Sequence, residues 1–242
     1  MNKQLIIDMH KQPDDTTCGP TSLHAVYRYY EDAISLEEVI SQVNKLDGGG
    51  TLAVMLGIHA LKRGYKATIY TYNLQVFDPS WFNERQKTNL SAKLKEQAVA
   101  KKNNLKLQFA ISGYLEFLSL GGTVKFEDLT GDLIRKYLTR DIPILCGLSS
   151  TYLYNCSREI DSPEDGFNDI EGEPAGHFVV IYGYDKSDRK ILVADPLFTN
   201  PLSPNNHYYK VDSRRLNNSI LLGMITYDAN LLIIEKGKKI CR

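Results

Sequence analysis

Two apolar runs in the second half of the chain constrain its fold more than any other feature. The runs at residues 178–183 and 191–193 flank six consecutive polar residues at 185–190. Apolar, β-branched and aromatic residues on both sides of a short polar segment are typical of a β-hairpin. Antiparallel pairing about this turn places Asp195 opposite His177 or within a few positions of it. The pattern therefore predicts that these two side chains are neighbours.

Segments with helical periodicity precede most of the strand-like segments. Ser35-Leu36-Glu37-Glu38 forms a capping box, and Gly64 is typical of the residue after a helix. Helices are expected at residues 18–31, 36–43, 52–63, 83–104, 105–120, 132–139 and 213–222. Strands are expected at residues 5–9, 65–72, 142–148, 178–184, 191–195, 208–211 and 231–235. This order predicts an α+β fold, with N-terminal helices packed on an antiparallel sheet.

The chain of 242 residues is long enough to bury the core of one elaborated domain. Residues 83–104 are rich in lysine and sparsely apolar, which is typical of a solvated helix. We expect a single domain over residues 1–242, with a helical insertion or cap at about residues 65–130.

Charge and hydropathy exclude several classes of protein. Lysine plus arginine equal aspartate plus glutamate at 29 each, which argues against binding to nucleic acid or to an anionic membrane. The longest apolar stretches fall far below the roughly 20 residues that span a bilayer. The apolar patch at residues 5–7 is too short for an export signal. The sequence predicts a cytoplasmic protein and assigns no oligomeric state.

The cysteines and glycines give no sign of a metal or cofactor. Cys18, Cys146, Cys156 and Cys241 lack CxxC spacing, so we expect reduced thiols, no metal site and no cofactor. Cys146 lies in an apolar run and is expected to be an inert core thiol. The glycines at residues 48–50 lack the lysine of a phosphate-binding loop and are expected to form a connector.

Cys18 stands where a reactive thiol is favoured. It begins the helical segment at residues 18–31, and Pro20 is tolerated only in the first turn of such a helix. Backbone N–H groups and the helix dipole at this end favour a thiolate. Cys18 is therefore a candidate nucleophile.

His177, Asp195 and Gln12 are the candidate partners of this thiol. A carboxylate beside an imidazole fixes its tautomer and stabilises its charged form. Taken singly, His177 has the alternative of a core histidine and Asp195 that of a turn residue, but their joint placement favours catalysis. Gln12 lies six residues before Cys18, where its side-chain amide is placed to donate to a developing oxyanion.

These residues resemble a known family. Gln12, five intervening residues and Cys18-Gly19, with the segments at 176–185 and 194–196, resemble the C39 and C39-like cysteine peptidases of the papain-like superfamily. The resemblance implies a papain-like α+β fold and no cofactor. It also implies that Cys18 is the nucleophile, His177 the general base and acid, Asp195 its orienting group and Gln12 part of the oxyanion hole.

Relatives in this family cleave peptides after a double glycine through a thioester. Transporter-linked members carry membrane spans and an ATPase domain, and the present chain has neither. Their nucleophile commonly follows an acidic residue, whereas Thr17 precedes Cys18 here. The resemblance therefore implies a freestanding C39-like protein, and it leaves residues 65–130 unassigned.

Three functions remain open from the sequence. The first is hydrolysis of a peptide or isopeptide bond in a peptide or protein substrate. The second passes the acyl group of the thioester to an amine, and the third is a catalytically silent binding module. The other histidines are not expected to act as the base. His24 lies about 240° around the helix from Cys18, His10 has no orienting acid and is expected at the surface, and His59 and His207 are expected to be structural.

An acidic segment precedes His177. Residues 157–173 hold seven acidic residues against the single basic Arg158. This segment predicts either a preference for a positively charged substrate or a solvated surface loop.

Overall fold

The structure is a computed structural model that describes residues 2–46, 49–83, 88–160 and 166–237. Its strands are β1 (Lys3–Gln4), β2 (Lys66–Thr71), β3 (Thr123–Lys125), β4 (Ile144–Ser149), β5 (Gly176–Asp185), β6 (Lys190–Ala194), β7 (Tyr208–Asp212) and β8 (Asn230–Glu235). They form one sheet in the order β3-β2-β8-β4-β5-β6-β7, and β1 pairs with β5. Among the described strands, β2 and β3 are parallel and the other neighbours are antiparallel. The predicted α+β class is confirmed.

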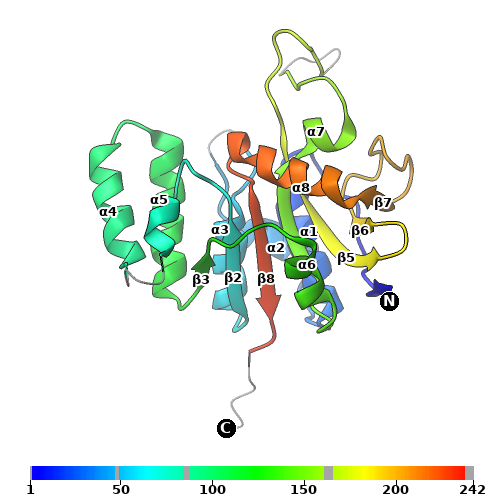
Figure 1. The fold of residues 1–242 in the computed structure, drawn as a ribbon, viewed down its shortest axis with the longest axis horizontal. Helices are drawn as coiled ribbons and strands as arrows, with labels where there is room; N and C mark the ends of the chain where they lie inside the picture. Colours follow the sequence, from blue (N-terminus) through cyan, green and yellow to red (C-terminus); the bar gives the residue numbers. More distant parts are fainter. Residues whose placement is uncertain (1, 47–48, 84–87, 161–165, 238–242) are drawn as a thin grey trace.

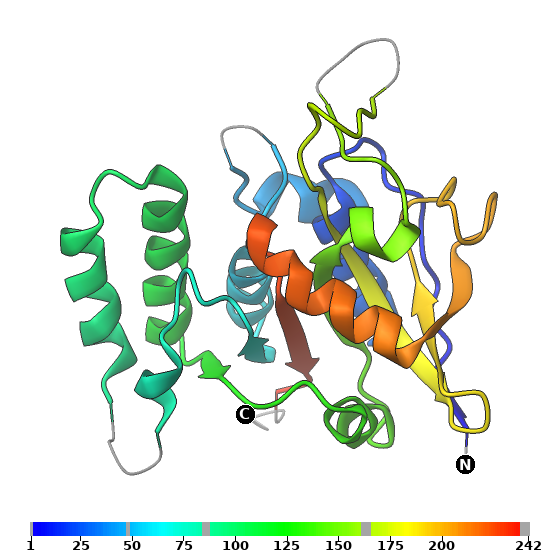
Figure 2. The same cartoon turned by 45° about the horizontal axis from the view of Figure 1, so that its top comes forward.

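Helices cover both faces of this sheet (Figures 1 and 2). They are α1 (Cys18–Tyr29), α2 (Leu36–Gln42), α3 (Ala53–Lys62), α4 (Leu90–Ala100), α5 (Leu105–Ser119), α6 (Gly131–Leu138), α7 (Ser150–Tyr154) and α8 (Ser213–Leu222), with two short 3₁₀ helices, η1 (Pro79–Phe82) and η2 (Gly223–Thr226). Helices α1 and α3 pack on one face and α8 on the other. Helices α4 and α5 stand beyond β3, with α5 against α3.

Helix α1 is fixed to the centre of the sheet. Leu23, Val26 and Tyr27 recur on one side of the helix, and all three are fully buried. The hydroxyl of Ser22 donates to the backbone oxygen of Phe178 on β5 at 3.1 Å. The first turn of α1 therefore lies beside the beginning of β5.

A bulge in the β5–β6 hairpin decides which side chains share a face. Lys190 pairs with Asp185, but the register shifts between Ile181 and Gly183, after which Ala194 pairs with Val180. Continuing that register places Asp195 opposite residue 179, two positions from His177 and on the same face. Without the extra residue Asp195 would lie opposite Val180, on the other face from His177.

The prediction of a strand at residues 5–9 is wrong. The N-terminal strand is β1 instead, which pairs with β5 beyond the point where β4 begins. Leu5 still donates to the backbone oxygen of Tyr182, but further along the hydroxyl of Tyr208 donates to Ile7 O and accepts from Met9 N. Leu5, Ile7 and Met9 are buried, so every second side chain of this segment faces the core as in a strand. At Ile7 and Met9 the hydroxyl of Tyr208 takes the place of the backbone partners that a neighbouring strand would supply.

Other local predictions agree with the structure to different degrees. The capping box of Ser35 and Glu38 is present, and Gly64 has a positive φ of 85° after α3. The helix expected at 83–104 is shorter, because α4 spans Leu90–Ala100. Strand β3 and helix α7 were not expected. The first of the predicted connector glycines and residues 84–87 lie outside the described residues.

The helical part of the expected insertion projects from an edge of the sheet. It consists of η1, α4 and α5, which lie between β2 and β3 in the chain. Strand β2 at its start pairs along its whole length with β8 and so belongs to the sheet. Helix α5 brings Lys106 to the same cavity as Cys18, which makes the insertion part of the wall of the site.

Candidate active site

Cys18 is the first residue of α1 and is 9% exposed. In the part of the chain that the structure describes, no side chain caps this helix, so the N–H groups at its start are left for another acceptor. Pro20 fits because a first-turn residue needs no intrahelical donor. The sulfur therefore lies in the positive field of a helix end, which stabilises negative charge there.

His177 lies at the start of β5 and is 6% exposed. Its Nε2 is 2.8 Å from Oδ1 of Asp195, which leaves Nδ1 for the hydrogen bond with Cys18. Burial lowers the pKa of the His177 imidazole, but the charges of Asp195 and Cys18 and the hydrogen bonds to them raise it well above its ordinary value. The ring is thus placed to accept and hold a proton from the thiol.

Asp195 follows β6 and is completely buried. Its Oδ1 accepts from Nε2 of His177 and from the backbone N–H of Leu197 at 2.9 Å. Its Oδ2 accepts from the hydroxyls of Tyr154 at 2.7 Å and Tyr209 at 2.8 Å. Four donors satisfy the four lone-pair positions of an ionised carboxylate.

The electrostatics of Asp195 agree with this geometry. Burial raises the pKa of the carboxyl group, but the charge of His177 and hydrogen bonds from His177, Tyr154 and Leu197 outweigh it and lower the pKa. Because an ionised Asp195 can only accept, the proton on Nε2 of His177 is fixed and Nδ1 faces the sulfur as the basic nitrogen.

Gln12 lies near the site, but its side-chain amide is already held by a hydrogen bond within its own loop. It is 6% exposed, and its backbone N–H donates to the carbonyl of Pro196, next to Asp195. Its Nε2 donates to the carbonyl of Asp14 at 2.9 Å, and its Oε1 is buried with no hydrogen-bond partner among the described residues. One of the two hydrogens on Nε2 is thus committed to Asp14 and the other is available.

A cavity of about 280 Å³ opens beside the sulfur of Cys18. It is lined by Asp15, Thr16, Cys18, Leu46, Gly49, Gly50, Thr51, Lys106, Gly176, Phe178, Thr226 and Asp228. Gly176 and Phe178 of β5, which flank His177 in the chain, form part of this wall, and Cys18 brings the thiol to the same cavity. A substrate group placed here lies next to the reacting atoms.

Three residues that lie at or beside this site were not identified from the sequence. Tyr209 lies on β7, a strand that was expected, and it pairs with Val193 on β6, two residues before Asp195. The order of β6 and β7 in the sheet is the signal that could have identified it. Tyr154 lies on α7, a helix that no pattern in the sequence predicted. Asp228 lies just before β8 and is 6% exposed; burial raises its pKa to about 7, against the opposing effects of Thr226, Lys106 and His177.

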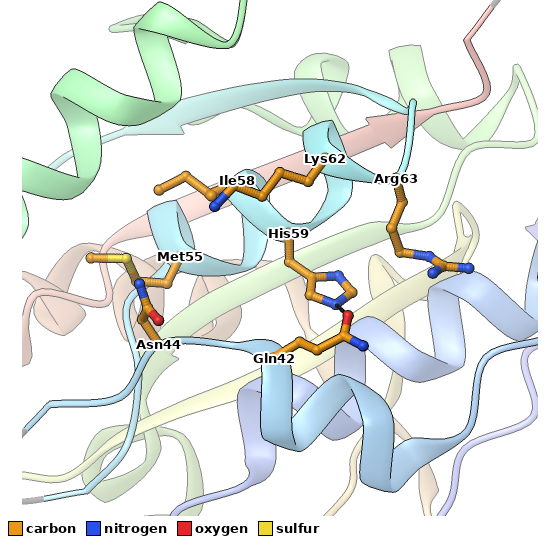
Figure 3. A pocket seen from close by; sticks show the side chains of 7 residues that line it. All are labelled: Gln42, Asn44, Met55, Ile58, His59, Lys62 and Arg63. Atoms are coloured by element: carbon orange, nitrogen blue, oxygen red, sulfur yellow. Dashed lines mark hydrogen bonds between the residues drawn. The ribbon is translucent and has the colours of Figure 1, made fainter.

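His59 belongs to a different cavity, of about 420 Å³, which none of the candidate catalytic residues lines (Figure 3). Its Nδ1 contacts the hydroxyl of Tyr27 at 2.7 Å, and its Nε2 contacts Oε1 of Gln42 at 3.1 Å. Burial lowers the pKa of His59, so this ring stays neutral with both nitrogens occupied. Such a histidine has no nitrogen left for catalysis.

The remaining thiols differ from Cys18 in their surroundings. Cys146 is completely buried on β4, and burial raises the pKa of its thiol. Cys18, Cys146 and Cys156 are free thiols, and Cys241 lies outside the described residues. The described ranges contain no cluster of three or more histidine, cysteine or acidic residues arranged to hold a metal ion. None of their helices combines the length and apolar character needed to cross a bilayer.

The expected acidic segment is described only in part, because Asp161, Glu164 and Asp165 lie outside the described residues. Glu159 forms backbone bridges with Phe167 and Glu173. Burial raises the pKa of Glu159 against the opposing charge of His177.

Several solved structures are similar to this chain over most of its length. A C39-like peptidase from Bacillus anthracis matches 99% of this chain and 100% of its own length, with 15% identity and a TM-score of 0.50. A double glycine motif protease from an AMS/PCAT transporter, solved with its leader peptide, matches 98% of this chain and 99% of its own length, with 14% identity and a TM-score of 0.46.

Xylellain, a cysteine protease from Xylella fastidiosa, matches 98% of this chain and 86% of its own length, with 13% identity and a TM-score of 0.44. At these identities the likeness concerns the fold. A comparison with curated protein sequences finds no significant match. The model of the Peptidase_C39 like family matches residues 4–218. Since that match spans most of the chain, the protein belongs to the Peptidase_C39 like family, whose fold it shares.

Proposed function

We propose that this protein is a cysteine peptidase that cleaves a peptide or isopeptide bond through Cys18, His177 and Asp195. The observation that carries the proposal is the arrangement of His177, with Nε2 on a fully buried carboxylate and its other nitrogen serving the thiol. Membership of a C39-like peptidase family supports a peptidase-like function.

The reaction begins with transfer of the Cys18 thiol proton to Nδ1 of His177. The sulfur attacks the acyl carbon and forms a tetrahedral oxyanion, and His177 returns the proton to the leaving amine as the carbon–nitrogen bond breaks. The product is a thioester on Cys18. Water, deprotonated by His177, attacks the thioester, releases the carboxylic acid and restores the thiol.

The supporting groups each have one role in this scheme. Asp195 holds the tautomer of His177 and stabilises the imidazolium formed in each half-reaction. The backbone N–H of Cys18 and the available hydrogen on Nε2 of Gln12 are the proposed donors to the oxyanion.

The test is cleavage of peptides by purified wild-type protein and two cysteine variants. The family resemblance makes a peptide with a double glycine before the scissile bond the first substrate. We expect Cys18→Ala to lower kcat/KM by roughly 10³-fold or more, as loss of a nucleophile does. Cys156→Ala, a partly buried thiol away from the cavity, is the matched control and retains activity. Full activity in Cys18→Ala would refute the proposal.

The same assay separates the two alternatives. An added amine that appears in the product in place of water makes the protein an acyltransferase. A Cys18 thiol that fails to react with iodoacetamide near neutral pH, with no peptide cleaved, makes it a binding module. The cytoplasmic location remains a proposal that rests on the reduced thiols and is tested by cell fractionation.

A further inference from the structure

Asp228 places a buried carboxylate in the wall of the cavity beside Cys18. It lies just before β8, is 6% exposed and lines the same cavity of about 280 Å³ as Cys18 and Gly176. The catalytic scheme above does not use it. A buried carboxylate at a substrate cavity is costly unless a partner compensates it.

The backbone holds Asp228 in one position. Its N–H donates to the carbonyl of Gly223 at 2.8 Å, and its carbonyl accepts from Asn230 N at 2.7 Å. Its side chain lies directly against Gly176, where an added Cβ would come 1.8 Å from Oδ2. The absence of a side chain at residue 176 thus makes room for the carboxylate immediately before His177.

The groups around Asp228 compensate its charge only in part. The Thr226 hydroxyl, Lys106 from α5 and His177 from β5 favour its ionised form, but burial outweighs them. Cys18 of α1 and Asp15 line the same cavity. The charge of Asp228 also helps to raise the pKa of the Tyr114 phenol on α5. Among the ion pairs of the described residues, none includes Asp228.

We propose that Asp228 forms a specificity subsite that binds a positively charged group of the peptide substrate, an ammonium or a guanidinium, next to the scissile bond. The proposal rests on the proposed peptidase function. A cation bound in the cavity supplies the positive counter-charge that the carboxylate of Asp228 lacks in the empty protein. A neutral group of the same shape leaves the carboxylate unpaired, which is how a buried polar site rejects such an analogue.

Lys106 acts at the rim of this subsite. It is exposed, and its Nζ lies 4.9 Å from the centre of the Tyr227 ring, next to Asp228 in the chain. It therefore gives the empty cavity a weak counter-charge that a substrate cation displaces. This assigns the helical insertion a role in specificity, because α5 carries Lys106.

The test compares matched peptides that the wild-type protein cleaves. Each position within three residues of the scissile bond is occupied in turn by lysine or its neutral analogue norleucine, and by arginine or citrulline. The N-terminus is free in one set and acetylated in another, which distinguishes a side-chain cation from an α-amino group. The readout is the ratio of kcat/KM for the cationic and neutral member of each pair.

We expect a ratio of at least tenfold at one position in the wild-type protein and near one in Asp228→Asn. Asp15→Asn, which removes another carboxylate of the same cavity, keeps the ratio of the wild type. Lys106→Met raises the ratio. The ratio in the wild type falls as the pH decreases from 8 to 6, because Asp228 becomes protonated. An equal ratio in wild type and Asp228→Asn, or no cationic preference at any position, would overturn the proposal.

A second measurement keeps the subsite testable if the wild-type protein cleaves no peptide. Equilibrium binding of the lysine and norleucine peptides is then measured in the Cys18→Ala variant and in the same variant with Asp228→Asn. Tighter binding of the lysine peptide that disappears with Asp228→Asn supports the subsite although the peptidase function has failed. Equal binding of both peptides refutes it.

Discussion

Nε2 of His177 donates to Oδ1 of Asp195 across 2.8 Å, inside a site where the carboxylate has no exposed surface. The contact settles the geometry of the ring, because the opposite nitrogen then faces Cys18. Asp195 itself is held by three further donors, from Tyr154, Tyr209 and Leu197. The orientation of the imidazole is thus set by residues that do not line the cavity beside Cys18.

Replacement of Asp195 by asparagine is expected to lower kcat by roughly 10²- to 10⁴-fold. The amide group of asparagine presents donors where His177, Tyr154 or Tyr209 also donate, so the preferred tautomer of His177 is lost. The measurement is kcat for a cleaved peptide, with folding checked by circular dichroism. Asp188→Asn, on the exposed turn of the same hairpin, is the control. A folded Asp195→Asn protein within tenfold of the wild-type kcat would contradict this role.

The hydroxyls of Tyr154 and Tyr209 are expected to contribute to stability through Asp195. Each donates to a buried charged acceptor, so Tyr154→Phe and Tyr209→Phe should each lower the free energy of unfolding by about 1.5–3 kcal/mol. Guanidinium unfolding measures the effect. Tyr152→Phe, on the same helix but exposed, should change it by less than about 0.5 kcal/mol. A loss of unfolding free energy in Tyr154→Phe as small as that in Tyr152→Phe would show that the hydrogen bond from Tyr154 to Asp195 contributes nothing to stability.

Asp228 is expected to make the protein less stable as the pH rises. Its pKa is raised from 3.8 to about 7 by burial, so the folded state binds this proton more tightly than the unfolded state. Its stabilising contribution is complete below about pH 4 and is lost as the pH rises through about 7, at up to about 1.4 kcal/mol per pH unit. Asp228→Asn should therefore gain stability relative to wild type over this interval. A difference independent of pH in guanidinium unfolding would exclude the shift.

Gly176→Ala is expected to disturb the site through Asp228. The added Cβ would come 1.8 Å from Oδ2, and the carboxylate or the strand must move. We expect Gly176→Ala to lower both the unfolding midpoint and kcat/KM, and to cost less stability in an Asp228→Ala background, where the nearest clashing group is absent and only the Thr226 hydroxyl, at 2.7 Å, remains. A double-mutant cycle measures this coupling. Purely additive effects would mean that the two residues do not contact each other.

The sequence by itself determined the elements that carry the candidate site. The apolar periodicity of residues 18–31 defined a helix that begins at Cys18, and the polar turn between two apolar runs defined the hairpin of β5 and β6. Local patterns of this kind are encoded by a few neighbouring residues, since they depend on periodicity and turn chemistry. They were enough to predict that His177 and Asp195 lie near each other.

Only the tertiary structure decided which face those residues share and what surrounds them. The bulge between Ile181 and Gly183 shifts the register by one residue and brings Asp195 to the face of His177. Tyr154 and Asp228 reach the site from α7 and from the approach to β8, through contacts that span 41 residues or more in the chain. Strand pairing and burial bring such residues together, and no local pattern in the sequence records them.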